Sequence, residues 1–261
     1  MSTQALTSNL IATAQKAGEA IMAIYEQDFS VYEKQDASPL TDADLAAHKI
    51  IVADLARYSD FPILSEESAD ISWEERQKWE TYWLVDPLDG TKEFIKKNGE
   101  FTVNIALIDK GIPVLGVVYA PVLKTTYIAD ETGASKIENS ESSPIQVKPW
   151  QQDELCKVVG SRSHQSPEIQ HFLDAIPGET EMLSMGSSLK LCLVAEGKAH
   201  YYPRLGPTSE WDTGAAHAVV LAAGGKVTVL EKGDAGYADS GTPLLYNHKE
   251  SILNPYFLVS A

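Results

Sequence analysis

Apolar residues recur at helical spacing in two stretches near the start of the chain. In the first stretch they are Leu6, Leu10, Ala14, Ala17, Ile21 and Ile24. In the second they are Leu45, Ile50, Ile51 and Leu55, behind the residues SPLTDAD at 38–44. Recurrence every three or four residues is typical of an amphipathic helix, and Ser, Thr, Asp and Pro commonly precede one. The pattern therefore predicts a long first helix and a second helix that begins near Thr41 and Asp42.

Shorter apolar runs between residues 61 and 130 predict β-strands. FPILSEES at 61–68 and YWLVD at 82–86 are expected to be short buried strands that end in acidic residues. Three β-rich runs follow at 101–109, 112–121 and 124–130, separated by turn residues. Runs of this kind are typical of a meander of antiparallel strands.

A polar, turn-rich segment at 133–154 is the best candidate for a junction between two domains, which we place at residues 1–150 and 151–261. After it, expected strands and helices alternate, which is typical of an α/β layer. The strands are expected at 156–161, 181–185, 199–204 and 226–230, and the helices from about 167, at 187–197 and at 212–225. The pattern predicts an α+β half followed by an α/β half, with helices and sheets in layers.

The composition of the 261 residues, 44% hydrophobic and 22% charged, is that of an ordinary soluble globular protein. A net charge of −16 argues against nucleic acid as a partner, although bound cations could still admit a small phosphorylated ligand. The first residues lack the basic start and apolar centre of a secretory signal, and no run suggests a membrane span. Cys156 and Cys192 stand far apart, so two reduced, buried thiols in a cytoplasmic protein are expected.

Asp86 and Asp89 are candidate functional residues, because two carboxylates this close repel each other and the fold must compensate that repulsion. They stand in DPLDG, directly behind a run expected to be a buried strand. Pro87 cannot continue a sheet ladder and Gly90 permits a sharp turn, so the chain is expected to turn back at the strand end. Both carboxylates can then converge, with the carbonyl of Leu88 between them. An all-oxygen site of this kind suits Mg²⁺ better than zinc.

Three other interpretations of DPLDG need to be weighed. A solvated turn is at least as good an interpretation of the motif alone, because Asp, Pro and Gly are common turn residues. Phosphatases that form an aspartyl-phosphate carry D-x-D-G-T, but a shift of one residue turns a strand side chain to the opposite face. An EF-hand loop needs acids at alternate positions and a distant Glu, which are absent here.

Acidic residues elsewhere in the chain favour the metal interpretation. If the strand at 61–68 lies beside the strand at 82–86, Glu66 or Glu67 reaches the same point as the two aspartates. Asp212 precedes a stretch rich in small residues and, taken alone, is most simply a helix N-cap. The small residues after it would let that helix approach another element closely.

The motifs LSEES, DPLDGTKEF and WDTGAA, in this order, resemble those of the inositol monophosphatase family of lithium-sensitive, Mg²⁺-dependent phosphatases. The resemblance spans almost the whole chain. Other stretches are similar to the bacterial CysQ-type branch, the 3'(2'),5'-bisphosphate nucleotidases; they are KEFIKKNGEFTVNIALI, LGVVYAPV, SRSH, GSSLKLCLVAEG and YPRLGPTSEWDT. Inositol phosphatases more usually carry Thr-Asn where this chain has Lys92 and Glu93. The implied fold is a layered α-β-α-β-α sandwich of the inositol monophosphatase and fructose-1,6-bisphosphatase type.

The resemblance implies a site for two or three Mg²⁺ ions, for which Mn²⁺ is expected to substitute and which Li⁺ and Ca²⁺ are expected to inhibit. The implied metal ligands are Glu66, Asp86, the carbonyl of Leu88, Asp89 and Asp212. Catalytic roles fall to Glu66 and Thr91, which would hold the attacking water. Asp44 would pair with Thr91 and support a further metal ion, although on its own it is equally an acid in a first helical turn.

The resemblance also implies a set of substrate contacts: Glu66, Leu88, Asp89, Gly90, Thr91, His164, Gly186, Ser187, Lys190, Arg204 and Asp212. A bisphosphate has one phosphate to cleave at the metal ions and another for cations to anchor. Taken alone, GSSLK is a helix start, His164 a surface or structural residue and Arg204 a surface charge. Tyr201 and Tyr202 are expected to be strand or core residues rather than platforms for a base.

The implied activity is hydrolysis of the 3'-phosphate of adenosine 3',5'-bisphosphate to AMP and phosphate, without a covalent intermediate. Its sulfated relative, 3'-phosphoadenylyl sulfate, would be a second substrate, in sulfur assimilation. We expect a cytoplasmic monomer without a nucleic-acid or protein partner; a peripheral place on the inner membrane stays open, although no basic amphipathic helix supports it. The alternatives are an inositol or sugar phosphatase with the same metal site and a non-catalytic regulator that binds Mg²⁺ or a nucleotide.

Overall fold

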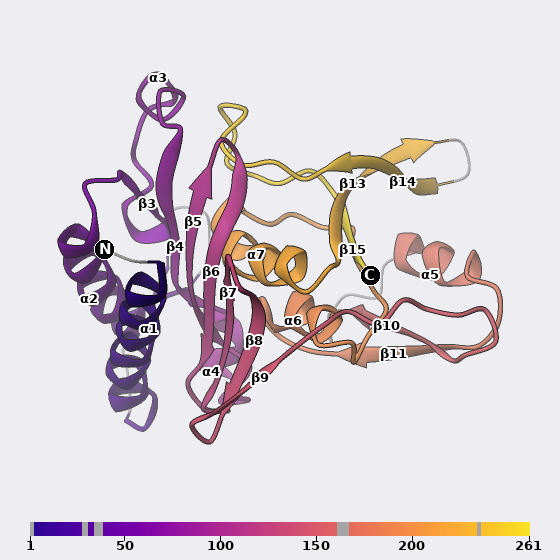
Figure 1. Cartoon of the computed structure of the whole chain (residues 1–261), viewed down its shortest axis with the longest axis horizontal. Coiled ribbons are helices and arrows are strands. Elements are labelled where there is room, and N and C mark those ends of the chain that lie inside the picture. The colour runs from indigo at the N-terminus through magenta and orange to yellow at the C-terminus, as the bar shows by residue number, and fades with distance from the viewer. Residues whose placement is uncertain (1–2, 28–30, 34–38, 161–166, 234–235) are drawn as a thin grey trace.

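The computed structural model describes residues 3–27, 31–33, 39–160, 167–233 and 236–261. Within these ranges, helices and sheets alternate in five layers along the long axis of the molecule (Figure 1). A helix pair, a seven-stranded sheet, a second helix pair, a six-stranded sheet and one outer helix follow one another. The expected α-β-α-β-α sandwich is therefore confirmed.

The first sheet has the strand order β3-β4-β5-β6-β7-β8-β9. Its strands are β3 (Ile63–Ser65), β4 (Thr81–Asp89), β5 (Thr102–Asp109), β6 (Ile112–Ala120), β7 (Thr125–Asp130), β8 (Gly133–Glu138) and β9 (Glu141–Pro144). β3 pairs with β4 in parallel, and the other pairs are antiparallel. The predicted meander is confirmed and continues for two more strands.

Those two additional strands occupy the first part of the segment at 133–154, in which we expected a junction between two domains. Residues 133–144 form the hairpin of β8 and β9 at the edge of the first sheet, and the chain crosses to the second sheet over residues 145–155. In β8 only alternate side chains are buried, and in β9 all four are exposed. An edge hairpin of this kind has little apolar periodicity, so local patterns in the sequence do not predict its strands.

The second sheet has the strand order β11-β10-β12-β15-β13-β14. Its strands are β10 (Cys156–Gly160), β11 (Thr180–Ser184), β12 (Tyr201–Arg204), β13 (Lys226–Gly233), β14 (Gly236–Pro243) and β15 (Phe257–Ser260). β10 runs parallel to β11 and β12, and the other pairs are antiparallel. The four strands predicted here are confirmed. β14 and β15 were not predicted, and β15 inserts between β12 and β13 through pairings distant in sequence.

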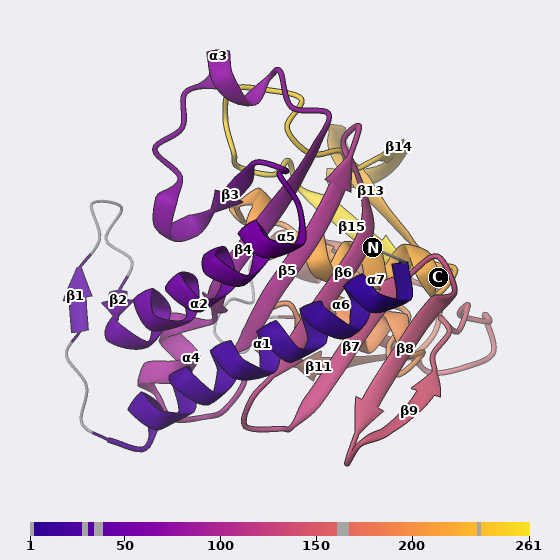
Figure 2. The same ribbon diagram turned by 60° about the vertical axis from the view of Figure 1, so that its left-hand side comes forward.

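Helices cover both faces of the first sheet. α1 (Thr3–Tyr25) and α2 (Asp42–Tyr58), both predicted, lie side by side on its outer face (Figure 2). α6 (Leu189–Ala195) and α7 (Gly214–Ala222) lie between the two sheets, and α5 (Pro167–Asp174) lies beyond the second sheet. The shorter elements are β1 (Val31–Glu33), β2 (Pro39–Thr41), η1 (Glu66–Ser68), α3 (Trp73–Arg76), α4 (Thr91–Ile95) and η2 (Glu210–Asp212). None of the helices in the described ranges has the length and apolar character needed to cross a bilayer.

Two apolar cores hold these layers together. One lies between the first sheet and the α1–α2 pair and includes Ile51 and Trp83. The other surrounds α6 and α7 between the sheets and includes Cys192 and Val219. Cys156 and Cys192 are both buried free thiols, as expected from their separation in the sequence.

Small residues let α7 approach the first sheet closely, as its sequence predicted. A Cβ added at Gly116 of β6 would lie 2.3 Å from the carbonyl oxygen of Ala215 in α7. A Cβ added at Gly214 would lie 2.8 Å from Cδ2 of Leu84 in β4. Because these contacts leave no room for a methyl group, they fix the height of α7, and of Asp212 before it, above the sheet.

We expect Gly116→Ala to destabilise the fold by about 1–3 kcal/mol, because the added methyl group overpacks the contact with α7. Circular dichroism should show a fall in Tm of several degrees. Gly206→Ala is the matched control, because its added Cβ would meet no atom closer than 3.9 Å. Equal melting temperatures for the two variants would contradict this account of the packing.

Candidate active site

A β-bulge in β4 brings Asp86 and Asp89 to one face of the first sheet. Asp86 pairs with Asn104 of β5 and Asp89 with Thr102, so three steps along β4 oppose two along β5. The extra residue returns to one face two side chains that an unbroken strand would place on opposite faces. We expected the strand to end at Asp86; it runs on to Asp89 instead, with Pro87 inside the bulge, where proline is tolerated.

Asp212 reaches the same point from the end of η2. Carboxylate oxygens of Asp86, Asp89 and Asp212 lie within 4.8 Å of one another. The Oδ2 atom of Asp212 accepts the backbone N–H of Ser209 at 2.8 Å and completes a capping box on η2. Asp212 is therefore not the N-cap of α7, which is Thr213. Three of the residues predicted as metal ligands thus form one cluster.

A second acid cluster lies at the start of η1. β3 runs beside β4 with Ser65 opposite Val85, as the metal interpretation required, and Glu66 and Glu67 follow directly. Carboxylate oxygens of Asp44, Glu66 and Glu67 lie within 4.8 Å of one another, and Asp44 is fully buried in the first turn of α2. The structure therefore places Asp44 and Glu66 in a group separate from that of the three aspartates, although the charge of Glu66 raises the pKa of Asp86.

The aspartate cluster consists of like charges that are buried away from solvent. Burial, and then the charges of Glu66, Asp89 and Asp212, raise the pKa of Asp86 well above its ordinary value. Burial and the charge of Asp89 raise the pKa of Asp212 to about 8. Burial raises the pKa of Asp89 to about 6, although the Lys190 ammonium opposes that shift. Bringing these groups together in ionised form therefore costs free energy, which a bound cation would offset.

The chain that leaves the bulge contains Leu88, Gly90 and Thr91. The N–H of Leu88 donates to Oδ1 of Asp86 at 3.1 Å, and the hydroxyl of Thr91 donates to the Leu88 carbonyl at 3.5 Å. Gly90 has a φ of +95°, and an added Cβ would lie 3.2 Å from the carbonyl oxygen of Glu100. The Leu88 carbonyl and the Thr91 hydroxyl therefore lie beside the acids, and the turn requires glycine at position 90.

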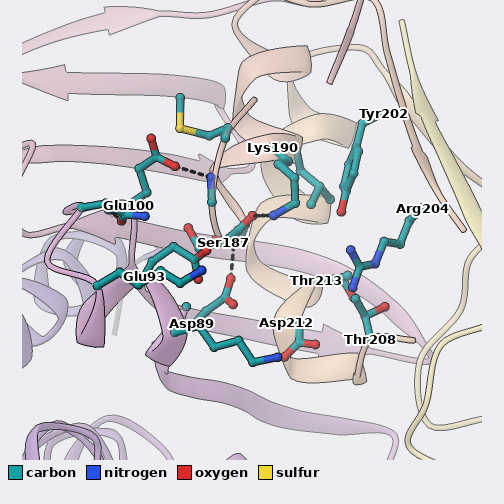
Figure 3. Close-up of a pocket in the computed structure, with 18 residues that line it drawn as sticks. Asp89, Glu93, Glu100, Ser187, Lys190, Tyr202, Arg204, Thr208, Asp212 and Thr213 are labelled. Carbon is teal, nitrogen blue, oxygen red and sulfur yellow. Dashed lines mark hydrogen bonds between the residues drawn. The ribbon is translucent and has the colours of Figure 1, made fainter. Parts of the chain in front are cut away.

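A pocket of about 580 Å³ opens from Asp89 and Asp212 (Figure 3). Its cationic lining residues are Lys92, Lys96, Lys190 and Arg204. Its other polar lining residues include Glu93, Asn98, Glu100, Ser187, Ser188 and Thr208, and Gly186 lines it as well. Figure 3 shows Glu93 and Glu100 on one side of the pocket and Tyr202 and Arg204 on the other. Acidic and cationic side chains in one cavity suit a ligand that carries phosphate at two positions, one of them at a metal ion.

Arg204 is held at the pocket by its guanidinium, which donates from Nη2 to the carbonyl of Pro207 at 2.8 Å. Tyr202 is 3% exposed in β12, as a strand residue should be, but it also lines the pocket. His164, predicted as a substrate contact, lies outside the described residues.

A turn at residues 186–188 joins the pocket to the metal cluster. The N–H of Ser188 donates to Oδ2 of Asp89 at 2.5 Å, and the Lys190 ammonium donates to the Ser187 carbonyl at 2.6 Å. The N–H of Gly186 donates to Oε2 of Glu100 at 2.8 Å. Sequence patterns did not identify Ser188 or Glu100, because each acts on a residue more than 80 positions away and no local signal marks such a contact.

The fold and the acid cluster define the class to which this protein belongs. The profile of the inositol monophosphatase family matches residues 2–256, and the chain belongs to that family of metal-dependent enzymes. Over 250 residues it is 52% identical to a 3'(2'),5'-bisphosphate nucleotidase CysQ of Salmonella typhimurium, a match that covers 95% of this chain and 96% of that protein. The CysQ nucleotidase of Escherichia coli strain K12 matches with the same identity and coverage.

Solved structures agree with this assignment. The crystal structure of CysQ from Bacteroides thetaiotaomicron, a bacterial member of the inositol monophosphatase family, superimposes with a TM-score of 0.83 at 45% identity. The superposition covers 99% of this chain and 97% of the CysQ chain. Inositol monophosphatase from Anabaena superimposes with a TM-score of 0.71 at 23% identity, which supports the fold alone.

The residues present fit a hard divalent cation. The donors within reach are carboxylate oxygens, without a thiol or imidazole in either acid group of the described chain, and oxygen-only sets select Mg²⁺, Mn²⁺ or Ca²⁺. Asp86 is 1% exposed, so its charge needs a partner of opposite sign.

In the absence of divalent ions, we expect the aspartate cluster to lower Tm progressively as pH rises from about 4 to about 8. The unfolded chain ionises its aspartates near pH 4, whereas folded Asp89 and Asp212 hold protons up to pH values of about 6 and about 8. Stability due to these raised pKa values is therefore present at low pH and lost as pH rises through that window. Saturating Mg²⁺ should raise Tm at pH 8 by about 5–10 °C and by less at pH 5.

The measurement is differential scanning calorimetry after dialysis against a chelator, with Asp212→Asn as the matched variant. This variant should lose part of the pH dependence and most of the response to Mg²⁺. A wild-type Tm that Mg²⁺ leaves unchanged at pH 8 would contradict a cation site among these acids.

Proposed function

We propose that this protein is a 3'(2'),5'-bisphosphate nucleotidase that hydrolyses the 3'-phosphate of adenosine 3',5'-bisphosphate to AMP and phosphate. The observation that carries the proposal is the cation-lined pocket that opens directly from Asp89 and Asp212. The relatives named CysQ, at 52% identity over nearly the whole chain, support the same activity. 3'-Phosphoadenylyl sulfate, which carries the same 3'-phosphate, is proposed as a second substrate.

The proposed metal ligands are Glu66, Asp86, the Leu88 carbonyl, Asp89 and Asp212. Bound Mg²⁺ would supply a water of lowered pKa and would compensate the charge that develops on the leaving oxygen. Thr91 and Glu66 would orient the attacking water, because the Thr91 hydroxyl, beside the Leu88 carbonyl, can accept or donate a hydrogen bond and the Glu66 carboxylate can accept one. Asp44, grouped with Glu66, would support these two residues and a further ion.

The second phosphate would be anchored by the cations that line the pocket beside the acids. Lys190 and Arg204 supply this positive charge, since each lowers the pKa of a neighbouring aspartate, Asp89 or Asp212. Ser187 supplies a hydroxyl and the neighbouring backbone. Gly186 must be glycine, because an added Cβ would lie 2.6 Å from the carbonyl oxygen of Glu100. His164 completes the proposed set of phosphate contacts.

Mn²⁺ is proposed to replace Mg²⁺, and Li⁺ and Ca²⁺ to inhibit, because they would compete for the same oxygen donors. We further propose a cytoplasmic monomer; the two buried free cysteines are consistent with a reducing compartment. A binding protein without catalysis would have no use for a hydroxyl such as that of Thr91 beside an acid cluster.

Asp89→Asn should lower kcat by roughly 10²- to 10³-fold, because it removes one negative charge that faces the metal ion. Release of phosphate from adenosine 3',5'-bisphosphate in Mg²⁺ is the measurement. Asp109→Asn, at the far end of β5 where Asp109 accepts the Thr81 hydroxyl at 2.6 Å, is the control and should keep its activity. Turnover by Asp89→Asn within a few-fold of wild type would remove Asp89 from the mechanism.

A comparison of substrates tests the proposed specificity. We expect kcat/KM for adenosine 3',5'-bisphosphate to exceed that for inositol 1-phosphate and fructose 1,6-bisphosphate by at least about 10²-fold. Inositol 1-phosphate has no second phosphate to anchor, and fructose 1,6-bisphosphate has no nucleoside between its two phosphates. A preference for inositol 1-phosphate would refute the nucleotide assignment and retain the metal chemistry. Tight nucleotide binding without release of phosphate would instead favour a regulator.

A further inference from the structure

We propose that the peptide group between Ser187 and Ser188 couples the phosphate-anchoring lysine to the metal-binding carboxylate, and that Ser188 is the positioning residue that holds this peptide. The inference rests on the proposed function, because it takes Asp89 as a metal ligand and Lys190 as an anchor for anions. It adds a residue that acts on both ends of the site without touching the reacting atoms.

The two ends of one peptide group contact the two parts of the site. The Ser187 carbonyl accepts the Lys190 ammonium at 2.6 Å, and the Ser188 N–H donates to Oδ2 of Asp89 at 2.5 Å (Figure 3). Both hydrogen bonds involve an ionised partner and are short, as charge-assisted bonds are. Because the peptide is conjugated, an ammonium on its oxygen strengthens its N–H as a donor to the carboxylate.

The Ser188 hydroxyl ties this peptide to strand β5. It lies 2.9 Å from Oδ1 of Asn104 and 2.9 Å from the hydroxyl of Thr102. Ser188 has one hydroxyl hydrogen, which it donates to Asn104, so Thr102 donates to Ser188. The three residues are at most 2% exposed, so water does not compete for these bonds.

The position of this clamp matters because its β5 partners lie directly beside the acids. Thr102 pairs with Asp89 and Asn104 pairs with Asp86 across the bulge. Ser188 therefore attaches the turn to the two residues that flank the metal cluster, and so fixes the turn relative to both aspartates.

The turn needs such a clamp, because its backbone adopts an uncommon conformation. Ser187 has a φ of +46°, which is unfavourable for a residue with a Cβ. Without the Ser188 hydroxyl the peptide could relax, and its N–H would no longer point at Asp89. The metal ligand and the lysine would then lose their common support.

A cation at Asp89 and an anion at Lys190 should therefore favour each other's binding. An ammonium has three donors, so Lys190 can bind a phosphate oxygen and keep its bond to the Ser187 carbonyl. An anion that immobilises Lys190 also immobilises the peptide, and the N–H then holds Asp89 in place for the metal ion. Reciprocally, the metal ion should tighten the binding of the anion by the same factor.

The test is calorimetric titration of Mn²⁺ into the metal-free protein, with and without adenosine 5'-phosphate, which has a phosphate for Lys190 but lacks the 3'-phosphate that the protein is proposed to hydrolyse. For wild type, the nucleotide should lower the Kd for Mn²⁺ by about 5-fold or more. For Ser188→Ala, the Kd for Mn²⁺ alone should rise about 5- to 10-fold, the effect of one buried hydrogen bond. The effect of the nucleotide on that Kd should largely disappear in this variant.

Ser240→Ala is the matched control, because it removes a serine hydroxyl that donates to the Val229 carbonyl at 2.9 Å in the second sheet. It should leave both Kd values unchanged. Thr102→Val gives a second route if Ser188→Ala does not fold: it removes the hydroxyl that donates to Ser188 and should shift Kd in the same direction. The double variant should resemble Ser188→Ala alone, since both changes release one clamp.

A folded Ser188→Ala or Thr102→Val protein with the wild-type Kd for Mn²⁺ and the wild-type response to the nucleotide would overturn this inference alone. A wild-type protein that binds no Mn²⁺ would overturn the proposed function together with it. A purely structural role for Ser188 would lower Tm and leave both Kd values of the folded protein as they are.

Discussion

Repulsion among buried carboxylates is the constraint on which the rest of this structure depends. Asp86, Asp89 and Asp212 have oxygens within 4.8 Å of one another, and Asp86 is 1% exposed. The protein's own cations only moderate this repulsion. Lys190 lowers the pKa of Asp89, and Arg204 lowers the pKa of Asp212. Both pKa values nevertheless stay above the ordinary value of an aspartate. A fold that holds acids in this way is incomplete without cations from solution, and it sacrifices stability of the metal-free state at its functional site.

The backbone achieves this arrangement with rigid elements rather than flexible loops. A bulge in β4 sets the spacing of Asp86 and Asp89, and a capped turn before α7 delivers Asp212. Glycines at positions 116 and 214 let α7 approach the sheet to a fixed distance. The three aspartates therefore come from two elements, β4 and η2, whose positions depend on core packing, so the cluster can hold its geometry with or without a metal ion.

Local patterns in the sequence predicted much of this architecture. The first two helices, the meander and the strands after residue 155 follow from apolar periodicity. Asp86 and Asp89 stand out because two carboxylates so close together behind a buried strand repel each other. The sequence did not reveal β15, the hairpin of β8 and β9 or the continuation of β4 past Pro87, because their pairing depends on partners that local patterns do not identify. The contacts of Ser188 and Glu100 were missed for the same reason. Resemblance to a family named the metal ligands, and geometry then explained how residues up to 126 positions apart come together: Asp86 and Asp212 share one cluster.

The most direct measurement is anomalous scattering from a crystal of this protein soaked in Mn²⁺. We expect at least one strong peak bounded by carboxylate oxygens of Asp86, Asp89 and Asp212, at metal–oxygen distances of about 2.0–2.2 Å. The peak should weaken or vanish in Asp89→Asn crystals soaked in the same way. Density for Mn²⁺ elsewhere in the molecule, with these three aspartates bound only to water, would contradict the central claim that the acids are held together for a metal ion.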